Sequence, residues 1–139
     1  MIFALVILFS STGCEDENNL DYLIAEENRF FNLYMDANYD SDSIKITKSG
    51  LYFIEYKEGD GLTPDSGDFV LINYLLYTIP DEKVVDTYTE EWARDHNLYS
   101  ENVLYGPYKY EYGTGITGLY EGLSMMKEGG IARLIFKSD

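Results

Sequence analysis

From Ile44 onward the sequence consists of short apolar segments, each closed by a turn rich in glycine, proline or aspartate, and this spacing most constrains the fold. Leu51–Tyr56 and Ile131–Phe136 are rich in β-branched, aromatic and other strand-compatible residues. Short strands separated by tight turns pair with their neighbours in antiparallel fashion. Phe69–Thr78 is too uniformly apolar to have a wet face, and we expect one strand there, covered on both sides.

Helical signals lie between these strands. Pro80–Lys83 turns the chain into a return strand at Val84-Val85, after which Thr87 and Glu90 are spaced as a capping box for a short helix reaching about His96. A strand with three tyrosines follows, then a helix that Thr117 could cap and that Gly129-Gly130 would end. The predicted class is α+β with a mostly antiparallel sheet. The tyrosines of that strand are Tyr108, Tyr110 and Tyr112, and the apolar residues of that helix are Leu119, Leu123 and Met126.

Before these strands, apolar residues recur at helical spacing from Leu20 to Met35, with Asn19 as the expected N-cap. The turn-forming stretch Asn38–Ser43 then marks a hinge. This amphipathic helix could pack on the domain or on a partner, and the pattern leaves both open.

The N-terminus reads as a secretory signal. Met1–Phe9 is an apolar run too short for a span of about 20 residues, and small and polar residues lead to the single Cys14. A Gly-Cys junction after small residues resembles the lipobox at which bacterial lipoproteins are cleaved and lipidated. No Lys or Arg precedes the run, and Ser11 stands where the lipobox usually has leucine.

The alternative for Cys14 is a buried free thiol on a core strand. The acidic and Asn-rich stretch Glu15–Asn19 favours the lipidated tether, because no core strand continues into such a run. We therefore predict a signal peptide at 1–13, a tether and helix at 14–43 and one globular domain at 44–139.

Composition excludes several functions. Asp and Glu number 25 against 10 Lys and Arg, and the net charge of -15 would repel a nucleic-acid backbone or an anionic membrane surface. One Cys and one His exclude an intramolecular disulfide and a Cys/His zinc site. We expect no metal, no cofactor and no nucleic-acid partner.

Two local motifs have competing interpretations. Gly113–Gly118 matches G-x-G-x-x-G between a strand and a helix, but only 21 residues (139 minus 118) follow, too few for a dinucleotide-binding βαβ domain. We expect these glycines to form a tight strand-to-helix turn instead. Asp86, after an apolar strand, could face a pocket or could help to start the following helix.

The order of the elements is the strongest signal. The following segments occur in this order along the chain: Gly50-Leu51-Tyr52, Gly59-Asp60-Gly61, Pro64–Val70, Asn73-Tyr74, Val85-Asp86, Pro107–Tyr110 and the block Ile116–Leu123 with Met126 and Gly129. This succession resembles the FKBP family of peptidyl-prolyl cis-trans isomerases over about Lys48 to Phe136. Lipid-anchored envelope members exist in that family, including gliding-motility-associated lipoproteins.

The resemblance implies an FKBP-like antiparallel sheet wrapped around a short helix, and it implies site residues. Tyr74, Asp86 and Ile116 match the catalytic positions, and Val85, Tyr108, Tyr110 and Leu119 match the substrate-binding positions. Val85 replaces an aromatic residue and Leu119 replaces the tryptophan of the pocket floor. The segment between Asp86 and Tyr108 is longer than in minimal members, and the sequence stops where the family adds a pocket-covering loop and a last strand, so we expect a truncated domain.

The resemblance further implies isomerisation of proline-containing polypeptides in the bacterial envelope, with the protein anchored by lipid, we expect at the outer membrane. Rotation about an X-Pro bond is opposed by amide resonance, and a dry apolar pocket favours the less polar twisted state without any nucleophile, metal or acid-base pair. A non-catalytic FKBP-like binding or chaperone module, favoured by Leu119 and Val85, and a structural lipoprotein of an envelope complex remain alternatives.

Overall fold

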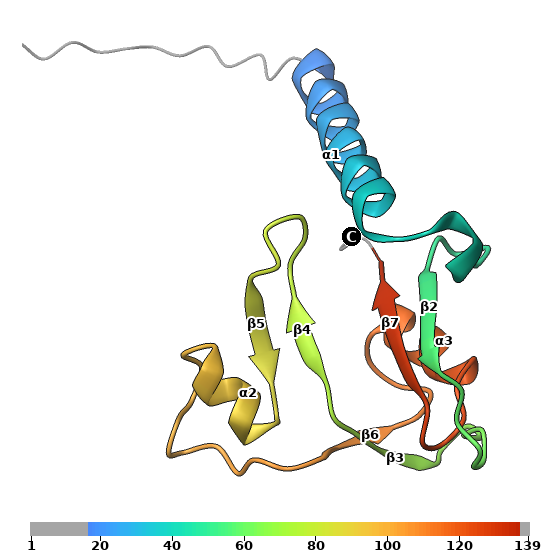
Figure 1. The fold of residues 1–139 in the computed structure, drawn as a ribbon, viewed down its shortest axis with the longest axis vertical. Coiled ribbons are helices and arrows are strands. Elements are labelled where there is room, and N and C mark those ends of the chain that lie inside the picture. The colour runs from blue at the N-terminus through green and yellow to red at the C-terminus, as the bar shows by residue number, and fades with distance from the viewer. Residues whose placement is uncertain (1–16, 137–139) are drawn as a thin grey trace, which may run out of the picture.

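The computed structural model describes residues 17–136 and has the predicted α+β class, with every strand pair antiparallel. The strands form three small sheets, in the orders β1-β2-β7, β3-β6 and β4-β5 (Figure 1). The leader, Cys14 and the start of the tether lie outside the described residues, and the predicted domain boundaries stay predictions. The helices are α1 (Glu17–Asn38), the 3-10 turn η1 (Ser41–Ser43), α2 (Glu90–Asp95) and α3 (Thr117–Ser124). The strands are β1 (Ile44–Ile46), β2 (Tyr52–Lys57), β3 (Phe69–Ile72), β4 (Leu75–Tyr77), β5 (Val84–Thr87), β6 (Tyr108–Glu111) and β7 (Ile131–Ile135).

The sheet β1-β2-β7 carries buried residues on both faces. Phe53 of β2 lies opposite Leu134 of β7, and its side chain is 0% exposed. Helix α3 packs closely on β7. A Cβ added at Gly122 would lie only 2.3 Å from Leu134 Cδ1, and one added at Gly118 would lie only 2.6 Å from Phe136 Cδ1. Glycine at these two positions therefore sets the short distance between helix and sheet.

The other face of this sheet is covered by the end of α1. Tyr34 and Met35 from its last turns form a buried cluster with Ile54 and Ile135, because successive side chains of a strand alternate between faces. The predicted helix is thus confirmed, although it begins at Glu17, so Asn19 lies inside it and is not its cap. Only its C-terminal part packs on the sheet, and its N-terminal part projects away (Figure 1).

The single strand expected over 69–78 is wrong. Strand β3 pairs with β6 and strand β4 pairs with β5, so the apolar run serves two sheets and changes between them at Asn73 and Tyr74. Phe69 and Leu71 are 60% and 67% exposed, while Val70 and Ile72 pack on a core cluster. The alternation was hidden because the outward positions are also apolar; the Lys109 ammonium lies 3.9 Å from the Phe69 ring centroid and covers part of it.

Candidate functional site

A tyrosine and an aspartate are joined at the base of the β4-β5 hairpin. Tyr74 directly precedes β4, and its hydroxyl donates a 2.6 Å hydrogen bond to Oδ2 of Asp86 in β5. The Thr87 hydroxyl donates a second 2.6 Å bond to the Tyr74 carbonyl oxygen. The Tyr74 side chain and backbone are therefore both fixed to the same strand.

The role of Thr87 differs from the predicted one. Its hydroxyl oxygen also accepts from the Thr89 N–H, and the N-cap of α2 is Thr89, which makes no side-chain cap bond. The expected Thr87–Glu90 capping box is therefore wrong. The Thr87 hydroxyl donates to the Tyr74 carbonyl oxygen, and the Asp86 carboxylate accepts from the Tyr74 hydroxyl. Neither side chain therefore caps helix α2.

Two further tyrosine rings pack beside this pair. Tyr108 of β6 lies edge-on to Tyr74 with ring centroids 5.9 Å apart, and Tyr88 lies 6.1 Å from Tyr74 and 5.2 Å from Tyr108. Such aromatic pairs are worth about 0.5–1.5 kcal/mol beyond their area burial. Sequence reasoning missed Tyr88, which directly follows β5 and lies outside the strand, so strand alternation could not place its ring.

Burial is the main cause that raises the pKa of Tyr74 well above its ordinary value, and the hydrogen bond to Asp86 raises this pKa further. The phenol therefore stays protonated at neutral pH and remains a donor to the carboxylate. The Tyr74–Asp86 pair therefore places a fixed hydrogen bond beside an aromatic surface.

Tyr110 lies elsewhere, in the core. It is buried with Tyr112 and Leu123, and its hydroxyl donates to the Thr114 carbonyl oxygen. A Cβ at Gly115 would lie 3.7 Å from Tyr110 Cε2, so the ring supports the turn that leads into α3. Tyr110 is thus placed under the loop before Ile116 and has no ring contact with Tyr74 or Tyr108 among the aromatic pairs of the described residues.

The remaining candidates surround this loop and the hairpin. Ile116 is the N-cap of α3, with an exposed side chain and a carbonyl that accepts from the Tyr120 N–H. Leu119 packs on the core cluster of Tyr110. Gly113 and Gly115 have φ of 101° and 69°, so the G-x-G-x-x-G segment forms the expected strand-to-helix turn. Val85 is partly exposed at a register shift of the hairpin, next to the paired Asp86.

Two cavities of the molecule lie away from these residues. One of about 290 Å³ lies between α1 and the β4-β5 turn, and one of about 170 Å³ is lined by β4, β5 and Arg133 of β7. None of the candidate residues lines either cavity. The candidate site is an open face of aromatic and aliphatic groups with one hydrogen-bonded polar pair. Within residues 17–136 no group of His, Cys, Asp or Glu side chains could hold a metal ion.

No protein-family model matches the sequence, and no curated protein matches it. The crystal structure of FkpA from Escherichia coli superposes on 90% of this chain with a TM-score of 0.57 and 21% sequence identity. The fold is FKBP-like. The match covers 60% of the FkpA chain, so this chain spans less than two thirds of its neighbour's length.

The FKBP-like fold confirms the class and arrangement predicted from the order of the sequence motifs. At this identity the likeness concerns the fold, and the assignment of individual site residues remains a prediction that rests on the motifs. Within the part of the chain that the structure describes, no helix is both long enough and apolar enough to cross a membrane.

Proposed function

We propose that this protein catalyses the cis-trans isomerisation of X-Pro bonds at the face formed by Tyr74, Asp86 and Tyr108. The observation that carries the proposal is the Tyr74–Asp86 hydrogen bond of 2.6 Å beside packed tyrosine rings on an FKBP-like fold. The sequence motifs predict that both residues belong to one site, and their side chains are in direct contact.

Isomerisation of an X-Pro bond needs no nucleophile and no acid-base pair. The barrier of about 18–20 kcal/mol comes from amide resonance, which is lost as the bond twists. Aromatic and aliphatic surfaces solvate the less polar twisted amide better than the planar one, and this is differential binding of the transition state. Asp86 acts as a positioning residue that holds Tyr74, and the resemblance assigns the backbone N–H of Ile116 to the substrate carbonyl.

A tetrapeptide with an apolar residue before proline tests the proposal. We expect the 139-residue chain to increase the first-order isomerisation rate in proportion to protein concentration, measured by chymotrypsin-coupled release of the trans peptide. Tyr108→Ala removes one wall of the site and should lower the slope of that line, whereas Tyr105→Ala, in the tyrosine pair Tyr99–Tyr105 outside the site, should leave it unchanged. A rate equal to the uncatalysed one at every protein concentration would refute catalysis.

A binding or chaperone module without catalysis is the second candidate. It is favoured by Leu119, which stands where the family has a tryptophan and packs on the core cluster instead of presenting a broad flat floor. In the same assay this candidate predicts no acceleration, together with saturable binding of an unfolded, proline-containing polypeptide.

We further propose that the protein acts on the bacterial cell envelope, lipid-anchored through Cys14 to the outer membrane. The support is the apolar run followed by a Gly-Cys junction and an acidic tether. Two or three acyl chains, at about 0.8 kcal/mol per buried CH₂, give stable anchoring. Cys14→Ala should move the protein from the salt-washed membrane fraction to the soluble fraction, while Ser10→Ala should not. Retention of Cys14→Ala in the washed membranes would contradict the anchor.

A further inference from the structure

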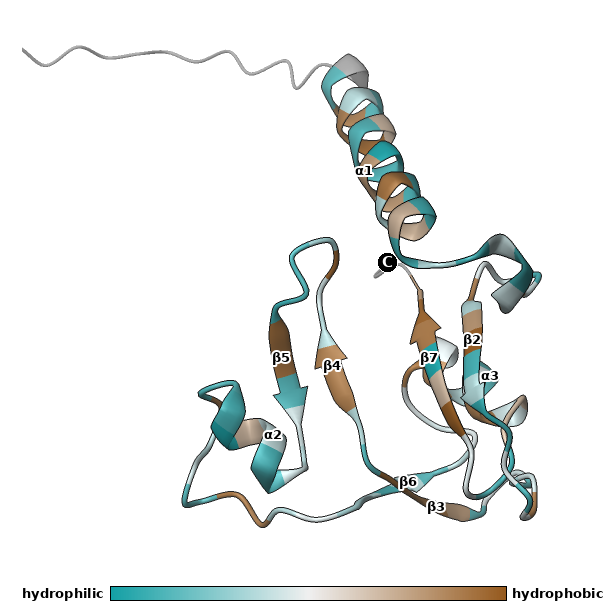
Figure 2. Cartoon of the chain, in the orientation of Figure 1, coloured by the Kyte–Doolittle hydropathy of each residue, from teal (hydrophilic) through white to brown (hydrophobic). Residues whose placement is uncertain are grey.

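Arg133 differs from the other arginines of the described residues because no carboxylate pairs with it. Arg29 and Arg94 each form an ion pair with a glutamate of their own helix, at 2.9 and 2.6 Å. No ion pair within residues 17–136 includes Arg133. The chain has 25 acidic residues, and β7, which carries Arg133, is otherwise an apolar strand (Figure 2). An unpaired cation on such a strand needs an explanation.

Tyrosine side chains surround the partly buried guanidinium of Arg133. Its Cζ lies 5.6, 5.9 and 5.0 Å from the ring centroids of Tyr39, Tyr56 and Tyr77. One of its N–H groups donates to the Tyr39 hydroxyl, and the others have no hydrogen-bond partner within the described part of the chain. Aromatic rings attract a cation but do not neutralise it. The guanidinium therefore keeps both its charge and most of its donors.

The same guanidinium lines a cavity of about 170 Å³ between the β4-β5 hairpin and β7. The Tyr77 hydroxyl, on another lining residue, is sealed from water and has no hydrogen-bond partner among residues 17–136. Burial is the main cause that raises the pKa of Tyr77 to about 12, so the phenol is a donor at neutral pH. A cation and an unused donor therefore belong to one small cavity. Its lining is completed by Leu75, Glu82, Val84 and His96.

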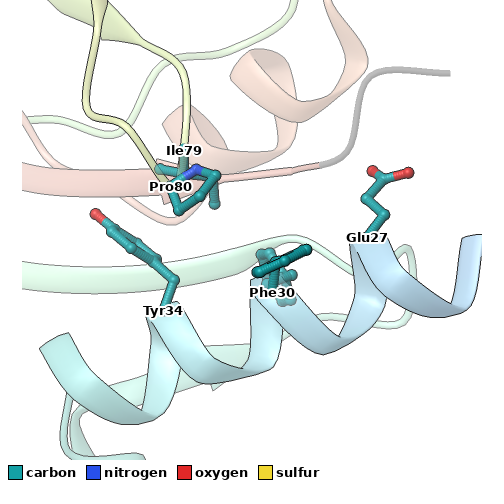
Figure 3. A pocket seen from close by; sticks show the side chains of 6 residues that line it. Glu27, Phe30, Tyr34, Ile79 and Pro80 are labelled. Atoms are coloured by element: carbon teal, nitrogen blue, oxygen red, sulfur yellow. The ribbon is translucent and has the colours of Figure 1, made fainter. Parts of the chain in front are cut away.

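Glu82 is the acidic residue of this lining, and it is held by another partner. Its Oε1 accepts a 2.8 Å hydrogen bond from the Tyr34 hydroxyl. Tyr34 belongs to α1, on the side where this helix faces Ile79 and Pro80 of the β4-β5 turn (Figure 3). Glu82 therefore leaves Arg133 without a carboxylate. Its negative charge also disfavours an anion with more than one charge in the cavity.

We propose that this cavity binds a carboxylate group, held by the Arg133 guanidinium with the Tyr77 hydroxyl as a further donor. The parallel N–H groups of a guanidinium match the two oxygens of a carboxylate. At about 30 Å³ for each small group, the cavity of about 170 Å³ holds roughly five or six heavy atoms. This size fits a carboxylate with a short aliphatic stem against Leu75 and Val84 and excludes a nucleotide.

The carboxylate can come from two sources, a small free carboxylate or the acidic side chain of a polypeptide. Inorganic phosphate is a poorer ligand, because Glu82 and the net charge of -15 oppose a second negative charge. No candidate residue of the isomerase site lines this cavity, so the proposal does not depend on the proposed function.

Nuclear magnetic resonance of the isotope-labelled 139-residue chain tests the proposal. Its three arginines give three Nε–H signals, and the spectrum of Arg133→Gln identifies one of them. We expect sodium acetate to shift the Arg133 signal with a dissociation constant in the millimolar range. Sodium chloride and sodium phosphate at equal ionic strength should shift it less than about a third as far. The signals of Arg29 and Arg94, which are exposed and already paired, are internal controls and should not move.

Two variants test the donors, with binding followed through the backbone amide signals of β4. Arg133→Lys keeps the charge but loses the paired N–H groups, and it should raise the acetate dissociation constant at least about tenfold. Tyr77→Phe deletes only the hydroxyl and should raise it at least about threefold. Tyr56→Phe is the matched control, because this ring also lies beside Arg133 but does not line the cavity. Circular dichroism checks that each variant is folded.

A pair of peptides distinguishes the two sources. An acetylated tetrapeptide amide with one glutamate should bind more tightly than acetate if the carboxylate belongs to a polypeptide, and no more tightly if it is a free small molecule. Either result supports a carboxylate site. The proposal is overturned if acetate moves the Arg133 signal no further than chloride does, or if the Arg29 and Arg94 signals move equally. It is also overturned if the same peptide with glutamine in place of glutamate binds as well.

Discussion

Asp86→Ala is expected to lower kcat/KM for an X-Pro tetrapeptide at least tenfold while the domain stays folded. Removing the carboxylate leaves the Tyr74 hydroxyl without its 2.6 Å acceptor and frees the ring next to Tyr108. A tenfold loss corresponds to about 1.4 kcal/mol of transition-state stabilisation, near the lower limit of about 1.5–3 kcal/mol for a single hydrogen bond to a charged group. The coupled protease assay measures the rate, and the far-ultraviolet spectrum reports the fold.

Two further variants test whether the pair acts as one unit. Tyr74→Phe deletes only the hydroxyl and should cause a loss similar to that of Asp86→Ala, and the double variant should lose little more, because coupled residues are not additive. Asp81→Ala is the control: this aspartate of the same hairpin accepts a 2.9 Å bond from the Thr78 hydroxyl outside the site. Additive losses, or an equal loss for Asp81→Ala, would show that Asp86 does not position Tyr74.

Phe53→Ala is expected to reduce the free energy of unfolding by about 3–5 kcal/mol. Phe53 of β2 is fully buried opposite Leu134 of β7, on the sheet face that Gly122 of α3 approaches, and this close packing makes a new cavity hard to collapse. Small domains have a total stability of about 5–15 kcal/mol, so this single change removes a large fraction of it. Urea unfolding followed by circular dichroism gives the difference.

Phe69→Ala is the matched comparison, because it removes the same side chain from a site that is 60% exposed. Its expected cost is below about 1 kcal/mol, mostly the contact with the Lys109 ammonium. Equal costs for the two variants would mean that the sheet face around Phe53 is not the core of the domain.

Much of the fold could be predicted from local patterns. The 3.6-residue periodicity of α1 and the turn at Pro80–Lys83 reflect local backbone chemistry, and each corresponds to a feature of the structure. The end predicted for α3 at Gly129-Gly130 is wrong, because α3 ends at Ser124 and these glycines directly precede β7. The pairing of Tyr74 with Asp86 came from the order of motifs, because no local rule brings together two residues 12 positions apart.

Other features depend on tertiary contacts that local patterns do not encode. Leu71 is as apolar as a core residue yet exposed, so composition could not reveal that Phe69–Thr78 is two strands. Thr87 and Glu90 have the spacing of a capping box, but the Thr87 hydroxyl donates to the Tyr74 carbonyl oxygen across the hairpin instead. Tyr108 and Tyr110 lie two residues apart in β6, so their side chains point to the same face of the strand. Only Tyr110 is a core residue, because Leu123 of α3 packs with it.

The change of sheet at Asn73 and Tyr74 also affects how the site can evolve. Tyr74 lies at the joint between two ribbons, the strand pair β3-β6 and the strand pair β4-β5, which share no strand. Any rotation of one ribbon against the other changes the gap between the Tyr74 and Tyr108 rings, because each ring is carried by a different ribbon. Substitutions far from the rings, at the joint or at the outer end of the hairpin, can therefore retune the shape of the site while every side chain in it stays the same.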